Sequence, residues 1–335
     1  MSDNKKRIID LELGDRTKKV FYIKEAEFRL RRNGETVDGF LKIVDKSGEV
    51  EAIYWDISTE KLKKLEKIKL ALIEGQVVKK KNNGQLQISI KTLEEALEYN
   101  EEDFIPSAKQ NIEDLMQQID EKINSIKNQY LKNLLISFFD DMHFRERFKK
   151  APAAKKLHQA YIGGLAEHTI NVANICEAIC KIHPRVNRDF LITIALLHDI
   201  GKIEEYQLNG TIEYTDKGKL IGHIIIGTEM IQEKIKQMPG FPDDLTIMIK
   251  HSILSHHGKF EFGSPKLPSI LPAVVLFYAD DTDAKIHGLL NLKEQNKNID
   301  KKWSEWVWWL ERSIYLAEQD IMEDSIAKAR EDLEE

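Results

Sequence analysis

The stretch ALLHDIGK, residues 195–202, joins an apolar helical run to a histidine, an aspartate and a lysine. Apolar residues such as Ile194 and Leu197 recur every three positions before His198, which indicates one buried face of a helix. The pair His198-Asp199 therefore stands at the end of that face. With ten histidines in 335 residues such a dipeptide is also expected about once by chance, so its meaning depends on the rest of the chain.

Histidine and charge are both unevenly distributed along the chain. All ten histidines lie between His143 and His287. Residues 1–92 carry 21 Lys and Arg against 15 Asp and Glu, whereas the remaining 243 residues carry 29 against 41. The two parts are therefore expected to do different work, with the chemistry in the part that bears the histidines.

Other histidines and aspartates also lie on apolar helix faces or at their ends. His168, for example, continues a stripe that includes Leu165 and Val172. A lone histidine in such a place is usually a hydrogen-bonded core residue. Here, however, a whole set of positions shares this character: His168, His198, Asp199, His223, His256, His257 and Asp280.

Burial of imidazoles and carboxylates together costs on the order of several kcal/mol for each uncompensated group. A divalent metal ion would compensate them. The mixture of imidazole and carboxylate without thiolate suits Mn, Fe, Co, Ni or Zn, and differs from a Cys-rich structural zinc site. Cys176 and Cys180 are expected to pack as ordinary core residues.

The first 92 residues are typical of a small β-barrel. β-rich runs are separated by turn residues such as Asn33-Gly34, and Ser58 offers an N-cap for a short helix. The order β-β-β-α-β-β is that of the OB-fold. The predicted elements are strands at 20–32, 36–44 and 49–55, a helix at 61–69, and strands at 70–80 and around 86–90.

After Leu93 the pattern becomes helical, and the second domain is expected to be an all-α bundle with a C-terminal helix. Helices are predicted at about 112–142, 164–183, 188–201, 222–238, 244–257, 270–290 and 303–333, the last with four tryptophans and an acidic tail. The predicted organisation is an OB-fold domain (1–92), a helical linker (93–150), the histidine-bearing domain (151–300) and a Trp-rich helix with its tail (301–335).

Composition limits the class of protein. No apolar run approaches the roughly 20 residues that a membrane span requires, and the charged start of the chain has no secretory pattern. Two cysteines do not make a disulfide framework. A cytoplasmic protein without a membrane partner is expected.

The histidine and aspartate pattern resembles that of the HD superfamily of metal-dependent phosphohydrolases, and longer blocks narrow the resemblance. LHQAYIGGLAEH (157–168), Gly222-His223, LSHHGK (254–259) and GSPK (263–266), behind an OB-fold, are similar to the YhaM family of 3'-to-5' exoribonucleases. The resemblance covers about residues 18–300. One departure is His158-Gln159, where that family often has two histidines, so no role is carried over to the second position.

The resemblance implies a centre with two divalent metal ions, with Mn as the first candidate and Co, Fe, Ni or Zn as alternatives. It implies that His168, His198, Asp199 and Asp280 hold the first ion. Asp199 would bridge to the second, which His223 and His256 hold. His257 is a candidate catalytic residue with Asp199 and Lys202, and a further candidate ligand. Lys202 would place its ammonium on a phosphate oxygen, or it is a solvated lysine at a helix end.

The basic barrel is expected to bind a single strand by base stacking and phosphate contact. The candidate residues are Phe40, Tyr54, Trp55, Lys79, Lys80 and Lys81. Because strand alternation sends about half of the aromatic side chains inward, each ring is alternatively a core residue. The three lysines are alternatively a solvated hairpin.

The resemblance and the charge division together predict a metal-dependent 3'-to-5' exonuclease. Its substrate would be single-stranded RNA, with single-stranded DNA as a further candidate, and its products nucleoside 5'-monophosphates. Two alternatives stay open: a nucleotidase or cyclic-nucleotide phosphodiesterase with a regulatory barrel, and a nucleic-acid-binding protein with a degenerate HD domain. A homo-oligomer is also left open, since tryptophan is enriched in interfaces.

Overall fold

The computed structural model describes residues 6–32, 34–80, 83–155, 159–296 and 302–317. The chain divides into two compact units, Met1–Asp280 and Asp281–Glu335. The first contains a barrel and a helical domain, and the second contains residues 281–296 of the last described helix and the segment 302–317.

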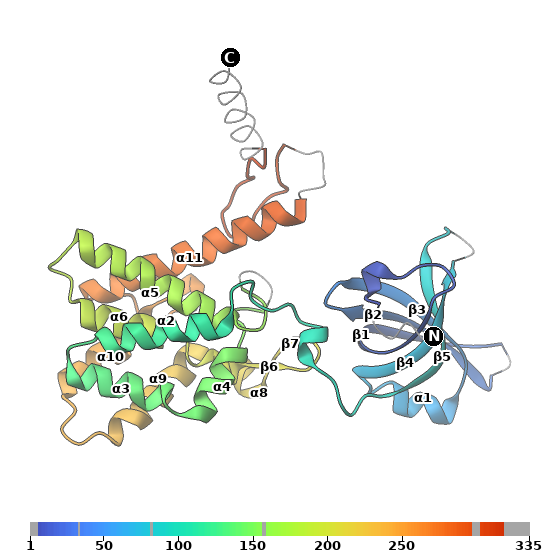
Figure 1. Cartoon of the computed structure of the whole chain (residues 1–335), viewed down its shortest axis with the longest axis horizontal. Coiled ribbons are helices and arrows are strands. Elements are labelled where there is room, and N and C mark those ends of the chain that lie inside the picture. Colours follow the sequence, from blue (N-terminus) through green and yellow to red (C-terminus); the bar gives the residue numbers. More distant parts are fainter. Residues whose placement is uncertain (1–5, 33, 81–82, 156–158, 297–301, 318–335) are drawn as a thin grey trace, which may run out of the picture. The chain divides into compact units, whose positions relative to one another are not determined.

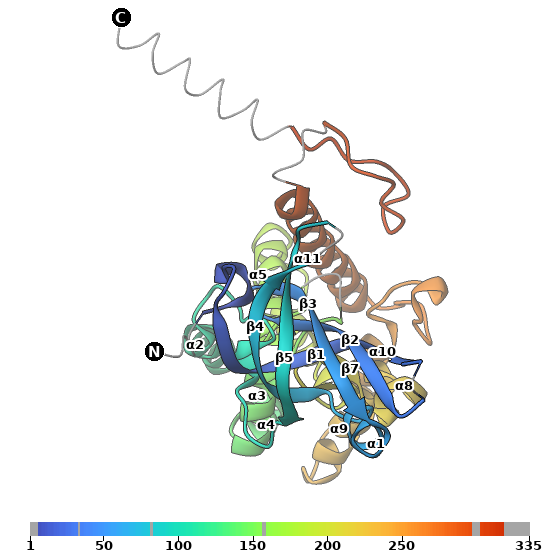
Figure 2. The same ribbon diagram turned by 90° about the vertical axis from the view of Figure 1, so that its right-hand side faces the viewer.

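The N-terminal domain is the predicted closed barrel, with strands in the order β1-β2-β3-β5-β4 (Figure 1). All neighbours are antiparallel except β3 and β5, which are parallel. Figure 2 shows the same strands from another side, crossing at an angle to one another. The elements are β1 (Arg16–Leu30), β2 (Thr36–Asp45), β3 (Gly48–Ser58), α1 (Thr59–Leu65), β4 (Leu70–Lys79) and β5 (Leu86–Glu95).

Local sequence explains how the barrel closes. Side chains of β2 alternate strictly between buried and half-buried, and Ser58 caps α1 by accepting the Lys61 N–H as predicted. Gly75 lies where the register of β4 and β5 shifts, and a Cβ there would come within 2.6 Å of the Ser89 carbonyl oxygen. The strand can bend against its neighbour because this residue has no side chain.

The second domain is built almost entirely from helices. Its elements are α2 (Ile112–Ser125), α3 (Gln129–Phe139), α4 (Met142–Lys150), α5 (Gly164–Ile182), α6 (Arg188–Leu197), α7 (Lys202–Glu205), α8 (Asp216–Leu220), α9 (His223–Lys236), α10 (Asp243–Ser255) and α11 (Leu271–Asn296). A small hairpin of β6 (Tyr206–Leu208) and β7 (Ile212–Tyr214) departs from the all-α prediction.

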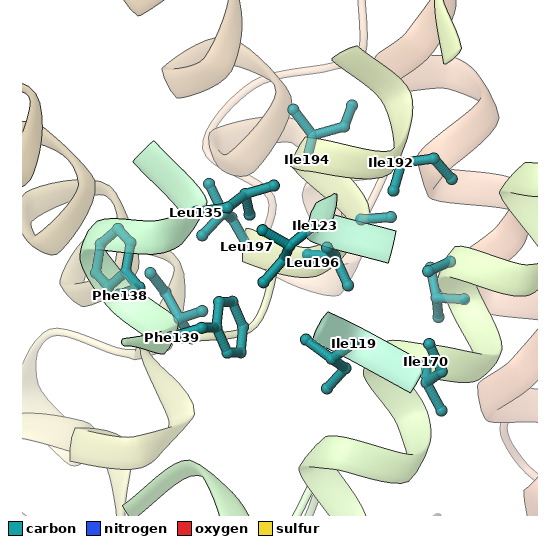
Figure 3. Packing of buried hydrophobic residues seen from close by; sticks show 14 of the residues in the cluster. Ile119, Ile123, Leu135, Phe138, Phe139, Ile170, Ile192, Ile194, Leu196 and Leu197 are labelled. Atoms are coloured by element: carbon teal, nitrogen blue, oxygen red, sulfur yellow. The ribbon is translucent and has the colours of Figure 1, made fainter. Parts of the chain in front are cut away.

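The core of this domain lies between α2, α3, α5 and α6. Figure 3 shows Ile119 and Ile123 of α2 beside Phe139 of α3, Ile170 of α5 and Leu197 of α6. These side chains are almost fully buried. The dipeptide His198-Asp199 therefore directly follows a helix that is held in a rigid apolar core. Cys176 and Cys180 are free, buried core residues as expected.

The predicted single helix over 112–142 is wrong, because this segment contains α2, α3 and the start of α4. Asn128 caps α3 by accepting the Leu131 N–H, and Asp141 caps α4 by accepting the N–H groups of His143 and Phe144. Asparagine and aspartate satisfy the free N–H groups at a helix start, so each of them begins a new helix here. Apolar spacing alone does not reveal these breaks.

The predicted helix over 303–333 is wrong for its described part. Residues 302–317 form turns and antiparallel bridges that pair Trp303 with Tyr315 and Val307 with Arg312. The ring of Trp309 packs against Gly288 of α11, where a Cβ would come within 2.9 Å of it. Residues 318–335, including the acidic tail, lie outside the described residues. Within the described ranges, none of the helices is both long and apolar enough to cross a bilayer.

Candidate metal centre

Five helices bring the predicted ligands to one place in the first unit. His168 lies on α5, His198 and Asp199 follow α6, and His223 begins α9. His256 and His257 follow α10, and Asp280 lies on α11. His168, His198 and His256 are fully buried, whereas Asp280 retains 15% of its side-chain exposure.

Two helix ends fix the orientation of the imidazoles that follow them. His198 Nδ1 donates to the carbonyl oxygen of Ala195 at 2.8 Å, and His256 Nδ1 donates to that of Ile253 at 2.7 Å. Carbonyls near a helix C-terminus have no partner within the helix, so they are available for these bonds. Both rings therefore turn Nε2, which then carries a lone pair, away from the helix.

The side chains form two groups. His168, His198 and Asp280 have ligand atoms within 4.8 Å of one another, and so do His223, His256 and His257. In the first group, His168 Nε2 is 3.1 Å from Asp280 Oδ1 and 3.3 Å from His198 Nε2. Each group offers three donors of the kind that bind a transition metal.

Asp199 lies between the two groups and faces both. Its Oδ2 is 3.2 Å from His198 Nε2 and 3.5 Å from His168 Nε2. Its Oδ1 is 3.4 Å from His223 Nε2 and 3.5 Å from His256 Nε2. One carboxylate is thus placed to serve both groups.

Three buried atoms of this centre have no hydrogen-bond partner: Asp199 Oδ1, His223 Nε2 and His256 Nε2. A buried polar atom without a partner costs about 1–3 kcal/mol. All three are atoms of kinds that bind metal ions, and Asp199 Oδ1 is 3.4 Å and 3.5 Å from the two nitrogens, so one cation could satisfy them together. The residues present therefore fit a metal centre.

Electrostatics keeps the carboxylates ionised. Burial acts to raise the pKa of Asp199, but the Lys202 ammonium and His198 outweigh it and hold that pKa well below its usual range. Burial likewise opposes ionisation of Asp280, but its hydrogen bond with His168 and the electrostatic effect of His198 and His256 hold its pKa below the usual value. Burial, with His256 and His223, lowers the pKa of His257 to about 3, so this ring is neutral and can act as a ligand.

Lys202 belongs to the buried part of the centre. Its side chain is 8% exposed, and its ammonium is 2.5 Å from Asp199 Oδ2. Burial acts to lower the pKa of Lys202, but the Asp199 carboxylate raises it above its usual value. The alternative of a solvated lysine at a helix end is therefore wrong, while contact with a phosphate stays a prediction.

Glu205 is a residue of the centre that the sequence did not reveal. It is 5% exposed and accepts from both the backbone N–H and Nδ1 of His223, each at 3.0 Å. Burial acts to raise the pKa of Glu205, but these hydrogen bonds and Lys202 lower it below its usual value. The only sequence signal is the pair Glu204-Glu205 after Lys202, which does not say which carboxylate turns inward.

The remaining described histidines have other partners or are exposed. His251 Nε2 accepts the backbone N–H of Ser269 at 2.9 Å. In the second unit, His287 Nε2 is 3.8 Å from Asp283, its neighbour one helical turn earlier. His143 and His183 are exposed, and His158 lies outside the described residues.

The barrel places two of its three candidate aromatic residues at the surface. Trp55 is 45% exposed and Phe40 is half-buried, with their ring centroids 6.2 Å apart. The Arg29 guanidinium lies 4.7 Å from the Phe40 ring, and that of Arg31 lies 5.6 Å from Trp55. This combination of rings and cations is typical of surfaces that bind single strands.

The prediction that Tyr54 binds nucleic acid is wrong. Its ring is 8% exposed within the barrel core, because alternation along β3 turns it inward while its neighbour Trp55 points out. Lys79 is exposed, and Lys80 is paired with Glu51. Lys81 lies outside the described residues.

A family model and a curated relative agree with this geometry. A family model described as "HD domain" matches residues 165–285, which include every ligand candidate. The curated protein "3'-5' exoribonuclease YhaM" of Geobacillus sp. (strain WCH70) is 32% identical over 285 residues, which are 84% of this chain and 86% of that protein. Among solved structures, asparaginyl-tRNA synthetase from Pyrococcus horikoshii has a TM-score of 0.22 at 14% identity, covering 73% of this chain and 62% of that one. The extent of the YhaM match, together with the HD ligand geometry, shows that the chain belongs to the YhaM family and is a hydrolase with a metal-dependent phosphohydrolase domain.

Proposed function

We propose that this protein is a 3'-to-5' exonuclease that hydrolyses single-stranded RNA and releases nucleoside 5'-monophosphates. Single-stranded DNA is a further candidate substrate. The proposal rests above all on Asp199, whose two oxygens face two separate groups of imidazoles. The name of the Geobacillus relative and the surface aromatic residues of the barrel support the choice of substrate.

The geometry supports two ligand sets. His168, His198 and Asp280 would hold one divalent ion, and Asp199 would serve both this ion and a second one. Mn is the first candidate for both ions. His223 and His256 would hold that second ion, with His257 as the additional ligand. Two bound metal ions supply an activated water and stabilise the oxygens of an in-line displacement at phosphorus.

The protein's own groups have separate tasks in this reaction. Asp199 and Asp280 stay ionised at neutral pH because nearby positive and imidazole groups lower their pKa values. Lys202 keeps a buried ammonium against Asp199, where it can stabilise negative charge on a phosphate oxygen. Because water supplies the attacking oxygen, the reaction requires no protein nucleophile.

The barrel would hold the strand while its 3' end is cut. Phe40 and Trp55 can stack on bases, and Arg29 and Arg31 lie over these rings. Arg29 pairs with Glu27, and Arg31 pairs with Asp38 and Asp56, so each would exchange these partners for backbone phosphates when a strand binds. Stacking on exposed rings requires bases that are not paired in a duplex, which favours a single-stranded substrate.

An oligoribonucleotide labelled at its 5' end tests the reaction. With Mn present, we expect a ladder of products that shorten from the 3' end, with nucleoside 5'-monophosphates released. Asp199→Asn should produce no ladder. A single internal cut, or turnover of mononucleotides and cyclic nucleotides alone, would contradict the proposal and support the phosphodiesterase or nucleotidase alternative.

A further inference from the structure

The segment between α10 and α11 exposes two phenylalanine rings beside the metal centre. Phe260 is 62% exposed and Phe262 is 49% exposed, and both lie on a single 3-10 turn. The turn begins three residues after His257. A span of that length covers at most about 11 Å, so Phe260 lies close to the ligand groups.

A direct hydrogen bond connects this turn to the metal centre. His257 Nδ1 donates to the carbonyl oxygen of Phe262 at 2.8 Å, which turns Nε2 of that ring toward His223 and His256. The residue that carries the second exposed ring therefore also orients a candidate ligand.

The turn is held in place on both sides. Ser264 is 3% exposed, and its hydroxyl lies 3.2 Å from the carbonyl oxygen of Leu254 and 2.8 Å from that of Lys266. Gly258 has a φ of +73°, and a Cβ there would come within 2.2 Å of the Phe277 ring. The exposed rings therefore belong to an anchored segment of the fold.

Two lysines flank the turn, Lys259 directly before it and Lys266 after it, while Glu261 lies within it. The Lys259 ammonium lies 5.2 Å from the centroid of the Phe262 ring, and Lys266 is exposed close by. An aromatic ring with a neighbouring cation can stack on a base while the cation contacts the backbone phosphate. An aliphatic or purely anionic ligand would use only one of these two features.

We propose that Phe260 and Phe262 form a nucleobase-stacking subsite that holds the bases at the 3' end of a single strand. The scissile phosphodiester would then lie at the metal ligands, and Lys259 would contact a neighbouring phosphate. This inference rests on the proposed nuclease function and specifies how its substrate is held. Stacking is tolerant of base identity, so the subsite favours unpaired 3' ends of any sequence.

Leucine and tryptophan substitutions separate stacking from simple apolar contact. We expect Phe260→Leu and Phe262→Leu to raise the KM for an oligoribonucleotide about 5- to 150-fold, while Phe→Trp at each position keeps it near the wild-type value. Mn binding measured by calorimetry should stay unchanged in all four variants. Leu267→Ala, which removes another exposed apolar side chain from the same segment, serves as the matched control and should not change KM.

A second measurement does not depend on hydrolysis. In the Asp199→Asn background, 2-aminopurine at the 3' terminus of an RNA should be quenched on binding, and more weakly quenched at an internal position. The Phe→Leu variants should lose the 3'-terminal quenching and the Phe→Trp variants should keep it. The subsite is overturned if the Leu variants quench 3'-terminal 2-aminopurine as strongly as the protein with both phenylalanines. It is also overturned if their higher KM is accompanied by loss of Mn binding. The two proposals can fail separately. If the wild-type protein produces no 3'-shortened products but 2-aminopurine is still quenched, the exonuclease proposal is rejected and the stacking subsite stands.

Discussion

At the scale of single residues, Glu205 determines which nitrogen of His223 is available to a metal. The carboxylate accepts from Nδ1, so Nε2 is the nitrogen that carries a lone pair toward Asp199. Carboxylates that hold a ligating histidine in this way orient the ring and raise its basicity. Glu205 thus acts on the centre through His223.

Removal of Glu205 should therefore weaken metal binding more than folding. We expect Glu205→Ala to lower the affinity for Mn or Co by about 10- to 100-fold, and Glu205→Gln to lose less because its amide oxygen still accepts from Nδ1. Calorimetric titration and metal content per chain measure this. Glu204→Ala is the matched control, since that carboxylate pairs with Lys217 at 2.6 Å and not with a histidine. Unchanged affinity in Glu205→Ala would show that His223 needs no such support.

In the barrel, Asp45 is likewise a buried carboxylate whose oxygens have hydrogen-bond partners. Its side chain accepts from Lys19 Nζ at 2.9 Å, from the Ile8 N–H at 3.0 Å and from the Ser47 N–H at 2.8 Å. Burial acts to raise the pKa of Asp45, but these hydrogen bonds lower it below its usual value. Its ionised form is therefore favoured in the folded protein.

Asp45→Asn should destabilise the barrel in a pH-dependent way. A lowered folded-state pKa contributes stability that is present above the unfolded value of about 3.9 and is lost as pH falls through the folded value. We expect the variant to lose about 3 kcal/mol of unfolding free energy at pH 7, since it leaves Lys19 without its charged partner. Urea denaturation should show this difference shrinking below about pH 4. A difference that grows on acidification would contradict this assignment.

At the scale of elements, the centre depends on how closely α7 and α9 approach each other. Gly201 immediately precedes α7, and a Cβ at this position would lie 2.1 Å from the carbonyl oxygen of His223 and 2.7 Å from the backbone nitrogen of Gly227. These backbone atoms cannot move aside as the end of a flexible side chain can. The glycine after His198-Asp199 is thus required by packing, although its φ is ordinary.

Gly201→Ala should push the start of α9, and with it His223, away from Asp199. We expect reduced Mn binding, lost hydrolysis and a lower melting temperature by several degrees, which calorimetry and circular dichroism can measure. Gly48→Ala is a suitable control, because the nearest atom to a Cβ there is 3.8 Å away. Full metal binding in Gly201→Ala would mean that the two helices can separate without moving the ligands.

At the scale of the whole molecule, the opposite charges of the two domains imply a division of tasks. Under the proposed function, the basic first 92 residues would hold a polyanion, and the acidic remainder would need bound metal to attract phosphate. Binding and hydrolysis should therefore be separable by substitutions in the full chain.

Asp199→Asn should abolish hydrolysis and leave single-strand affinity within a fewfold of wild type. Trp55→Ala should instead weaken affinity about 5- to 150-fold, as expected for loss of one stacked base. Fluorescence anisotropy with a labelled oligonucleotide over a range of salt concentrations measures both. Tyr54→Phe is the control, because it removes only the hydroxyl of a buried ring. If Asp199→Asn loses affinity as strongly as Trp55→Ala, the two tasks are not divided in this way.

The sequence by itself determined the barrel order, most helices and the set of histidines and aspartates, because apolar periodicity, turn residues and motif spacing are local properties of the chain. It could not determine the breaks at Asn128 and Asp141 or the bridged segment 302–317, where capping and pairing override periodicity. Only the tertiary structure decided that Tyr54 faces the core, that Lys202 is buried against Asp199, and that Glu205 turns inward while Glu204 does not. The physical reason is the same in each case. Burial and partner choice depend on residues distant in sequence, and the fold alone brings them within bonding distance.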